Sequence, residues 1–285
     1  MSREACLNRK ETQTALKSTN SLSQYDFEES SYMHRHLAGC ENKTTYLKKA
    51  ISPPKMSVGI VIPARNEEKN IKDIICRLRE LGYDNILVID GKSQDATSRI
   101  AEINGAKVVA QTGLGKGNAV RQALAEKYFD VDALVLMDAD GSMAPEEVPL
   151  FVEALASGAD VVKGSRFCKG GCTYDMTLTR RIGNELMMLG VNILFSTKYT
   201  DLCYGFAVLN KRAVEALAPK LQSNNFEIEA EIFIKAAQIG LEVKEVPSTE
   251  FKRKYGTSNL RAIRDGVSIF TRIFKEFLNS EMTDF

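Results

Sequence analysis

The sequence is short of histidine, of paired cysteines and of long apolar runs. The only two histidines, His34 and His36, stand near the N-terminus of a chain of 285 residues. Serine–histidine and cysteine–histidine catalysis are therefore disfavoured for the rest of the chain, as are histidine-rich metal sites. Chemistry there has to depend on carboxylates, lysine, arginine, tyrosine and backbone amides.

The six cysteines form no CxxC pair, which favours free thiols in a reducing compartment over a zinc site. No apolar run reaches the roughly 18 residues that a membrane-spanning helix requires. The first ten residues also lack the apolar segment of a secretory signal. We therefore expect a cytoplasmic protein whose contact with a membrane, if any, is peripheral.

Charge is nearly balanced, with 38 basic and 37 acidic residues and a formal net charge of +1. This balance gives no bulk attraction to nucleic acid, so no nucleic-acid partner is expected. Residues 1–55 are polar without a sustained apolar period, and Pro53-Pro54 marks a junction. We expect a poorly ordered or loosely docked extension over 1–55, followed by one folded domain over 56–285.

After residue 56, short runs of β-branched residues alternate with segments of helical periodicity. This alternation predicts an α/β fold with a mostly parallel central sheet and helices on both faces. Strands are expected at 58–62, 85–89, 107–110, 133–137, 159–163, 206–209 and 242–246. Helices are expected at 67–80, 95–104, 116–127, 145–155, 177–195 (interrupted near Gly190), 211–217, 226–239 and 260–278.

The strongest local signal is LVLMDADG at 134–141, a buried strand that ends in Asp138 and Asp140. Open α/β sheets bind ligands at the carboxyl ends of their strands, and burying unpaired carboxylates there is costly. Mg²⁺ or Mn²⁺ accepts one or two carboxylates together with substrate phosphate oxygens. Capping of a helix that begins near Pro145 is the alternative, but both acids lie too far upstream. We therefore predict a divalent metal site at Asp138 and Asp140.

Two other predicted strands also end in polar residues. The second strand ends at Asp90, and the first runs into IPARNE at 62–67. Because the carboxyl ends of parallel strands meet at one edge of a sheet, the three ends together predict a single site. The glycine-rich GLGKG at 113–117 has the spacing of neither a P-loop nor a dinucleotide fingerprint.

The ordered set IPARNE, VIDGKSQDAT, GKGNAV and LMDADG resembles the family 2 glycosyltransferases. Within that family the chain is most similar to the polyprenyl-phosphate (dolichol-phosphate) mannose and glucose synthases and their bacterial relatives. The resemblance implies a GT-A fold and an inverting transfer from a UDP- or GDP-sugar to a polyprenyl-phosphate-type acceptor. Its later motifs are GSRF at 164–167, RRIGN at 180–184, DLCYGF at 201–206, FEIEAE at 226–231 and RKYGTSNL at 253–260.

The resemblance also implies roles for individual residues. Asp90 should accept a hydrogen bond from the base, and Lys116 should face the nucleotide unless it is an exposed helical lysine. The residues implied to bind the nucleotide sugar are Pro63, Ala64, Arg65, Glu67, Asp90, Lys116, Asp138, Ala139 and Asp140. The sequence departs from the family pattern at Asp90-Gly91-Lys92-Ser93, which lacks the second Asp of VDDGS, and at Ser142, where DxDxQ has Gln. The second departure leaves the third metal contact open.

The implied chemistry develops positive charge on the anomeric carbon and negative charge on the departing diphosphate. A metal ion and nearby basic groups stabilise such a leaving group. Arg253 lies in the predicted basic loop RKYG, which either closes over the diphosphate or is a solvated loop. Asp140 and Arg253 are thus predicted to contribute to catalysis.

Two kinds of acceptor remain open. A lipid phosphate is already anionic, and Arg166 and Arg181 are then the predicted acceptor-binding residues. A hydroxyl of a small molecule or glycan needs a base, for which Glu227 and Glu229 are the candidates, unless they are surface residues at a helix start. A retaining enzyme with a small polar acceptor, a nucleotidyltransferase and a non-catalytic nucleotide-sugar-binding module are the further alternatives.

The last predicted helix, at 260–278, carries most of its apolar residues on one face. These residues are Ile263, Val267, Phe270, Ile273, Phe274 and Phe277, with Arg261, Arg264, Arg272 and Lys275 around them. Such a helix either lies in a lipid interface or packs against the sheet as ordinary core. The oligomeric state is left open, with a homo-oligomer among the possibilities.

Overall fold

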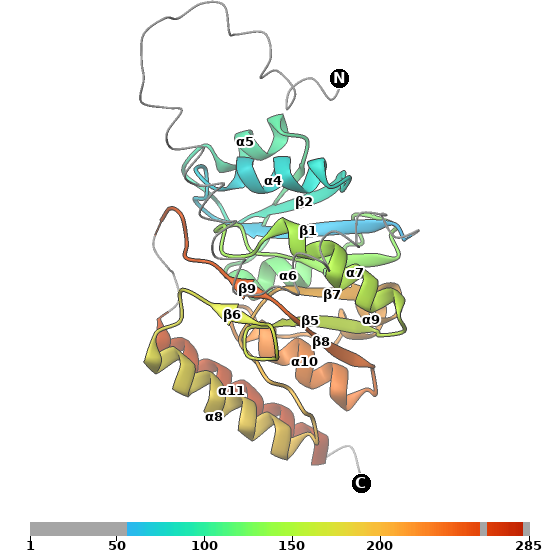
Figure 1. Cartoon of the computed structure of the whole chain (residues 1–285), viewed down its shortest axis with the longest axis vertical. Coiled ribbons are helices and arrows are strands. Elements are labelled where there is room, and N and C mark those ends of the chain that lie inside the picture. Colours follow the sequence, from blue (N-terminus) through green and yellow to red (C-terminus); the bar gives the residue numbers. More distant parts are fainter. Residues whose placement is uncertain (1–55, 257–260, 282–285) are drawn as a thin grey trace, which may run out of the picture. The chain divides into compact units, whose positions relative to one another are not determined.

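A seven-stranded sheet in the order β3-β2-β1-β4-β7-β5-β8 forms the centre of the computed structural model (Figure 1). The structure describes residues 56–256 and 261–281, so the predicted extension over 1–55 lies outside the described residues. The strands are β1 (Val58–Ala64), β2 (Asn85–Asp90), β3 (Lys107–Ala110), β4 (Ala133–Leu136), β5 (Val161–Ser165), β7 (Ala207–Asn210) and β8 (Val243–Pro247). All neighbours pair in parallel except β7, which is antiparallel to both β4 and β5. The predicted mostly parallel α/β sheet is confirmed.

Helices cover both faces of this sheet, as the alternation of strands and helices predicted. One face packs against α4 (Ile71–Glu80), α5 (Thr97–Ile103) and α7 (Val148–Ala156), which follows the short 3₁₀ helix η1 (Pro145–Glu147). The other face packs against α6 (Lys116–Ala125), α9 (Lys211–Leu217) and α10 (Ile228–Gln238). Beyond α10, α8 (Leu178–Leu194) and α11 (Ala262–Glu281) lie side by side, at the end of the molecule opposite α5 (Figure 1).

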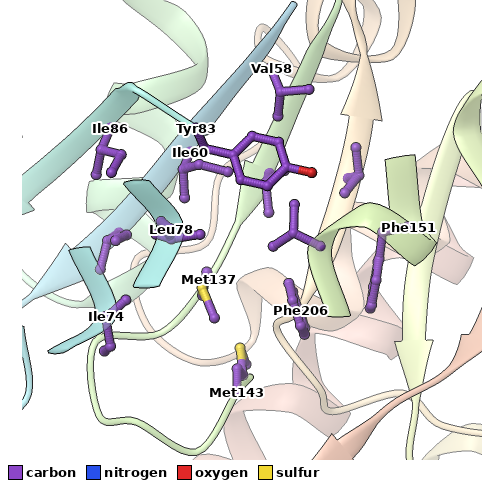
Figure 2. Close-up of a cluster of buried hydrophobic side chains, with 14 of the residues drawn as sticks. Val58, Ile60, Ile74, Leu78, Tyr83, Ile86, Met137, Met143, Phe151 and Phe206 are labelled. Carbon is purple, nitrogen blue, oxygen red and sulfur yellow. The ribbon is translucent and has the colours of Figure 1, made fainter. Parts of the chain in front are cut away.

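The period of two in β1 assigns its side chains to two separate cores. Ile60 and Ile62 are fully buried on the α4–α7 face, whereas Val61 between them is buried on the α6–α10 face. On the first face Phe151 of α7 stacks on Phe206 with ring centroids 4.3 Å apart, in the cluster drawn in Figure 2. Burial on both faces explains why these strands read as continuous apolar runs.

Three details differ from the expectation. α8 runs without a break through Gly190, because a glycine costs a helix only about 1 kcal/mol and the packing of α8 against α11 outweighs that cost. α4 begins at Ile71 rather than at residue 67, since Glu67 and its neighbours form turns at the sheet edge. A small second sheet of β6 (Cys172–Thr173) and β9 (Thr249–Glu250) was not predicted, because strands of two residues show no period.

Candidate active site

The three predicted strand ends do meet at one edge of the sheet. Ala64 at the end of β1 is in register with Asp90 at the end of β2. On the other side of β1, Met137 at the end of β4 donates its backbone N–H to the Val61 carbonyl at 3.0 Å. Asp138 and Asp140 follow directly, in the loop after β4 that we name the acidic loop. This loop therefore leaves the sheet beside Pro63 and Ala64, at the edge where the parallel strands have their carboxyl ends (the carboxyl edge).

Asp138 shares a lysine with a second acid. Its Oδ1 lies 2.6 Å from Nζ of Lys116, and the same Nζ lies 2.7 Å from Oε1 of Glu229. All three side chains are at most about a quarter exposed. Lys116 is therefore an interior member of the site rather than an exposed helical lysine.

Glycines bring Lys116 and Glu229 together. Lys116 is the first residue of α6, and a Cβ on Gly115 or Gly117 would lie only 2.3–2.6 Å from backbone oxygens of residues 223 and 224. Gly115 also has a φ of +87°, which favours glycine. The glycine-rich turn thus lets the start of α6 approach the loop before α10, and Glu229 lies in the first turn of that helix.

Burial is the largest influence on the carboxyl group of Asp138. It raises the pKa of Asp138 to about 6, helped by the negative charges of Asp140 and Glu229 and opposed by Lys116. Burial alone would lower the pKa of Lys116, but its two carboxylate partners outweigh that effect and raise it. The lysine is held charged between two acids that compete for it.

Asp140 has a cation of its own. Its Oδ2 lies 2.6 Å from Nη2 of Arg253, and its Oδ1 accepts the backbone N–H of Ser142 at 2.9 Å. Arg253 Nη1 also lies 3.5 Å from Oε1 of Glu67, a carboxyl group whose pKa is raised by burial. The predicted basic segment does reach the acidic loop, and Phe251 anchors it there by donating its N–H to the Ser142 carbonyl at 2.8 Å.

Asp90 forms the far side of the site. Its carboxylate accepts the Ser93 N–H at 3.2 Å, and the next residue, Gly91, donates its N–H to the Ala64 carbonyl at 2.8 Å. A Cβ on Gly91 would lie 3.1 Å from the Gln111 side chain and 3.2 Å from Cβ of Arg65, so the loop is closely packed. Lys92, at the first departure from the family pattern, is exposed with a φ of +62°.

The two arginines predicted to bind an acceptor lie in different environments. Arg166 is only 3% exposed; its guanidinium pairs with Asp201 at 2.7 and 2.9 Å and with Glu250 at 3.1 and 3.2 Å. Arg181 lies on the surface in the first turns of α8, 3.0 Å from Glu185. The structure therefore gives Arg166 a place in an interior network and leaves Arg181 at the surface.

Of the two candidate bases, Glu229 is held by Lys116, as described above. Glu227 lies just before α10, where its Oε1 accepts the Asn225 N–H at 3.3 Å. Its Oε2 is buried without a hydrogen-bond partner among the described residues. Within the described part of the chain, Glu229 thus pairs with a lysine and Glu227 with a backbone amide.

The carboxylates fit a hard divalent cation only in part. Among residues 56–256 and 261–281, no group of three or more His, Cys, Asp or Glu side chains is arranged to hold a metal ion. Asp138 and Asp140 would supply two oxygen ligands of the kind that Mg²⁺ and Mn²⁺ accept, and water and substrate phosphate would supply the remaining ligands. The donor set thus fits an ion that binds together with a diphosphate.

A surface that the sequence revealed only in part lies on the two outer helices. α8 and α11 expose eleven large apolar side chains, with exposed fractions from 37% at Leu194 to 82% at Ile263. They are Leu178, Ile182, Leu186, Leu189, Ile193 and Leu194 of α8, and Ile263, Val267, Phe270, Phe274 and Leu278 of α11. The predicted face of α11 divides, because Ile273 is buried in the core while Phe270 and Phe274 are exposed. The spacing of the apolar residues in α8 is a sequence signal that could have identified the α8 part of this exposed surface.

The segment that leads into α8 is linked to the acidic loop. Tyr174, just before α8, stacks on Phe251 with ring centroids 6.1 Å apart, and its N–H bonds the Glu250 carbonyl at 2.9 Å. Phe251 in turn is the residue bonded to Ser142. No helix in the described part of the chain is long and apolar enough to cross a membrane.

A mostly apolar cavity of about 360 Å³ lies at the edge of the sheet opposite the acidic loop. It is lined by Tyr128, Phe129 and Leu134 near the amino ends of the strands. Its charged groups include Lys127 and Lys211, which pair with Glu215 and Asp130. Because these charges neutralise each other, the cavity lacks the convergent polar groups of the carboxyl edge.

Several known proteins are similar to this chain in sequence or in fold. The chain matches the Glycosyl transferase family 2 domain over residues 59–218. It is 34% identical to the glycosyltransferase AglJ of Haloferax volcanii, over 78% of this chain and 73% of that protein. It is 30% identical to an undecaprenyl-phosphate mannosyltransferase of Micrococcus luteus, over 72% of this chain and 88% of that protein.

Among solved structures, glucosyl-3-phosphoglycerate synthase of Mycobacterium tuberculosis, in complex with Mn²⁺, UDP and glucosyl-3-phosphoglycerate, has the same fold. The TM-score is 0.61 at 20% identity, with 82% of each chain covered. This likeness supports the GT-A arrangement of the sheet. Together with the family match over more than half of the sequence, it leads to one conclusion: the chain belongs to glycosyl transferase family 2 and has a GT-A fold.

Proposed function

We propose that this glycosyltransferase moves a sugar, with inversion, from a UDP- or GDP-sugar to a polyprenyl-phosphate-type lipid at a membrane surface. The observation that carries the proposal is the exposed apolar face of α8 and α11, together with the contacts that link the segment before α8 to the acidic loop. The mannosyltransferase of Micrococcus luteus, whose name specifies undecaprenyl phosphate, supports the same acceptor class.

The donor would lie along the carboxyl edge of the sheet. Pro63, Ala64, Arg65 and Asp90 surround the proposed nucleoside pocket, while Asp138 and Asp140 would hold the divalent ion. When bound, that ion neutralises the diphosphate and makes it a better leaving group. Lys116 and Arg253, which contact these two acids, would stabilise the negative charge that develops on the departing diphosphate.

The acceptor phosphate would supply the nucleophile. One of its oxygens forms a bond to the anomeric carbon from the face opposite the diphosphate, as the bond from that carbon to the diphosphate breaks. The nucleoside diphosphate leaves with the electron pair, and no proton has to be removed from an ionised phosphate. Arg181 at the start of α8 remains our candidate to bind this phosphate; Arg166 instead supports the interior, since its guanidinium is already occupied.

The membrane is the partner that fits the α8–α11 face. Eleven exposed apolar side chains on two adjacent helices are far more than the scattered apolar residues of an ordinary surface. Exposed Arg181, Arg264 and Lys275 lie on the same two helices, and exposed Arg261 directly precedes α11, so the face combines apolar contact with attraction to anionic headgroups. The lipid tail would remain in the bilayer while its phosphate reaches the acidic loop.

The test is a transfer assay with vesicles that contain a polyprenyl phosphate. The protein is incubated with radiolabelled UDP- and GDP-sugars and Mn²⁺, and the lipid fraction is analysed for a sugar phosphodiester. We expect labelled lipid only with the phosphorylated polyprenol. Transfer to soluble hydroxyl compounds without any labelled lipid would overturn the proposal and favour Glu229 as a base.

A further inference from the structure

We infer that Lys116 and Arg253 are counterions that neutralise the metal-binding carboxylates before the donor binds, and that they pass to the donor diphosphate when it arrives. This inference rests on the proposed function, because it assumes a nucleoside diphosphate and a divalent ion at Asp138 and Asp140. It concerns the order in which these ligands bind.

The two acids are paired in the same way. Asp138 contacts Lys116 at 2.6 Å and Asp140 contacts Arg253 at 2.6 Å. Each cation also bridges to a second carboxylate, Lys116 to Glu229 at 2.7 Å and Arg253 to Glu67 at 3.5 Å. Charge-assisted contacts as short as the 2.6 and 2.7 Å contacts of Asp138, Asp140 and Glu229 are among the stronger polar interactions in proteins. A metal ion that approached either acid alone would have to displace or repel its cation.

The charge balance of the cluster sets what it can accept. Four carboxylates and two cations leave two negative charges, the amount that one divalent ion neutralises. With the ion bound, however, Lys116 and Arg253 would face an additional positive charge at close range. A diphosphate removes this repulsion because it offers both cations new anionic partners. The geometry therefore favours metal and diphosphate together over metal alone.

The surrounding structure allows such a change of partner. The backbone of Lys116 is fixed by the packed Gly115 and Gly117, but its side chain is long and extends from the first turn of α6. Arg253 lies in the non-helical segment after β9, anchored two residues earlier at Phe251. Both charges can thus shift by side-chain rotation without rearrangement of the sheet.

Lys116→Met separates this role from simple nucleotide binding. Without the lysine, Mn²⁺ alone should bind about tenfold more tightly, because the ion no longer competes with a charge-assisted contact to Asp138. UDP in saturating Mn²⁺ should bind about tenfold more weakly, because the diphosphate loses its charge-assisted contact to Lys116. Free Mn²⁺ is measured by electron paramagnetic resonance, and UDP by calorimetry. Lys116→Arg keeps the charge and should restore weak binding of Mn²⁺ alone.

Lys211→Met is the matched control. Lys211 is also the first residue of a helix and pairs with an aspartate, but it lies at the opposite edge of the sheet. Lys211→Met should change neither the affinity for Mn²⁺ alone nor the affinity for UDP in saturating Mn²⁺. Unchanged or weaker binding of Mn²⁺ alone by folded Lys116→Met would overturn the inference, with folding checked by circular dichroism.

Asp140→Asn keeps the inference separate from the proposed function. If Asp140→Asn abolishes binding of the Mn²⁺–UDP complex but Lys116→Met leaves Mn²⁺ affinity unchanged, only the counterion role fails. If Asp140→Asn binds Mn²⁺ and UDP as well as the wild type does, the metal site itself fails, and the proposed donor chemistry fails with it.

Discussion

At the scale of single residues, Asp90 has the most directly measurable role. Its carboxylate lies at the end of β2, where the Ser93 amide orients it and Ala64 lies in register beside it. A carboxylate fixed in this way can accept a hydrogen bond from a nucleobase, and hydrogen bonds to charged groups contribute about 1.5–3 kcal/mol. The aspartate is only partly buried, so it stays accessible to the nucleotide.

Replacing Asp90 by Ala should therefore weaken nucleotide binding by about 1.5–3 kcal/mol, as measured by calorimetric titration of UDP and GDP. Asp73→Ala is the control, because Asp73 is an exposed aspartate on α4 that pairs with Arg77 at 3.3 Å. Equal affinity of the Asp90 variant and the wild type would remove Asp90 from the site.

Asp140 is the residue whose loss should stop the reaction. Asp140→Ala removes one of the two proposed metal ligands, so we expect no detectable sugar transfer and no binding of Mn²⁺–UDP. The fold should persist, because Asp140 lies in a loop whose contact to Phe251 is made by the backbone of Ser142. Asp130→Ala, which breaks an exposed ion pair at the other edge of the sheet, should retain activity. Full activity of the wild type in excess chelator would contradict this prediction.

At the scale of secondary-structure elements, the buried ion pairs of Arg166 join segments that are distant in the sequence. Arg166 follows β5, Asp201 precedes β7, and Glu250 ends β9. The strand β9 leads directly into the segment that carries Arg253 to the acidic loop. The network thus fixes the start of the segment that carries Arg253, although Arg166 itself pairs with Asp201 and Glu250 rather than with Asp138 or Asp140.

Arg166→Met should lower the free energy of unfolding by about 3–5 kcal/mol, since it leaves two buried carboxylates without their partner. Arg181→Met, on the exposed surface of α8, should leave the melting temperature nearly unchanged and instead raise the KM for the lipid phosphate. Thermal unfolding and the vesicle assay distinguish these outcomes. A stable Arg166→Met protein with only a raised KM would return Arg166 to the acceptor site.

At the scale of the whole molecule, α5 and the α8–α11 pair lie at opposite ends (Figure 1). The proposed nucleotide site lies along the carboxyl edge of the sheet between them, and the apolar face belongs to the outer pair. This arrangement would let the protein rest on a bilayer through α8 and α11 while the donor enters from the aqueous side.

Phe274→Glu should reduce binding to anionic vesicles about tenfold in a co-sedimentation assay, because burying a large apolar side chain contributes about 1.5–3 kcal/mol. Leu186→Glu on α8 should act in the same way. Ile103→Glu is the matched control: Ile103 is 61% exposed at the end of α5, compared with 52% for Phe274, but it lies away from the face. Equal losses in all three variants, or no binding by the wild type, would contradict the membrane contact.

Much of this molecule follows from local sequence. The apolar runs at 58–62, 85–89 and 133–137 are strands because β-branched residues bury well on both faces of a parallel sheet. The polar residues that follow them lie at one edge of the sheet, since parallel strands bring their carboxyl ends to the same side. Fold class, sheet edge and the acidic loop were therefore predictable from chain order alone.

Contacts between distant segments were decided only by the tertiary structure. Spacing shows that Asp138 and Asp140 are close together, but Lys116 and Glu229 are 113 residues apart, as are Asp140 and Arg253. Arg166 resembled an acceptor ligand in the sequence because nothing local indicated Asp201 and Glu250 as its partners. Periodicity depends on neighbours along the chain, whereas a charge pairs with whichever opposite charge the fold brings within about 4 Å. The sequence by itself thus determined where the site lies, and the packing of α6, α10 and the segment after β9 determined which cations meet its acids.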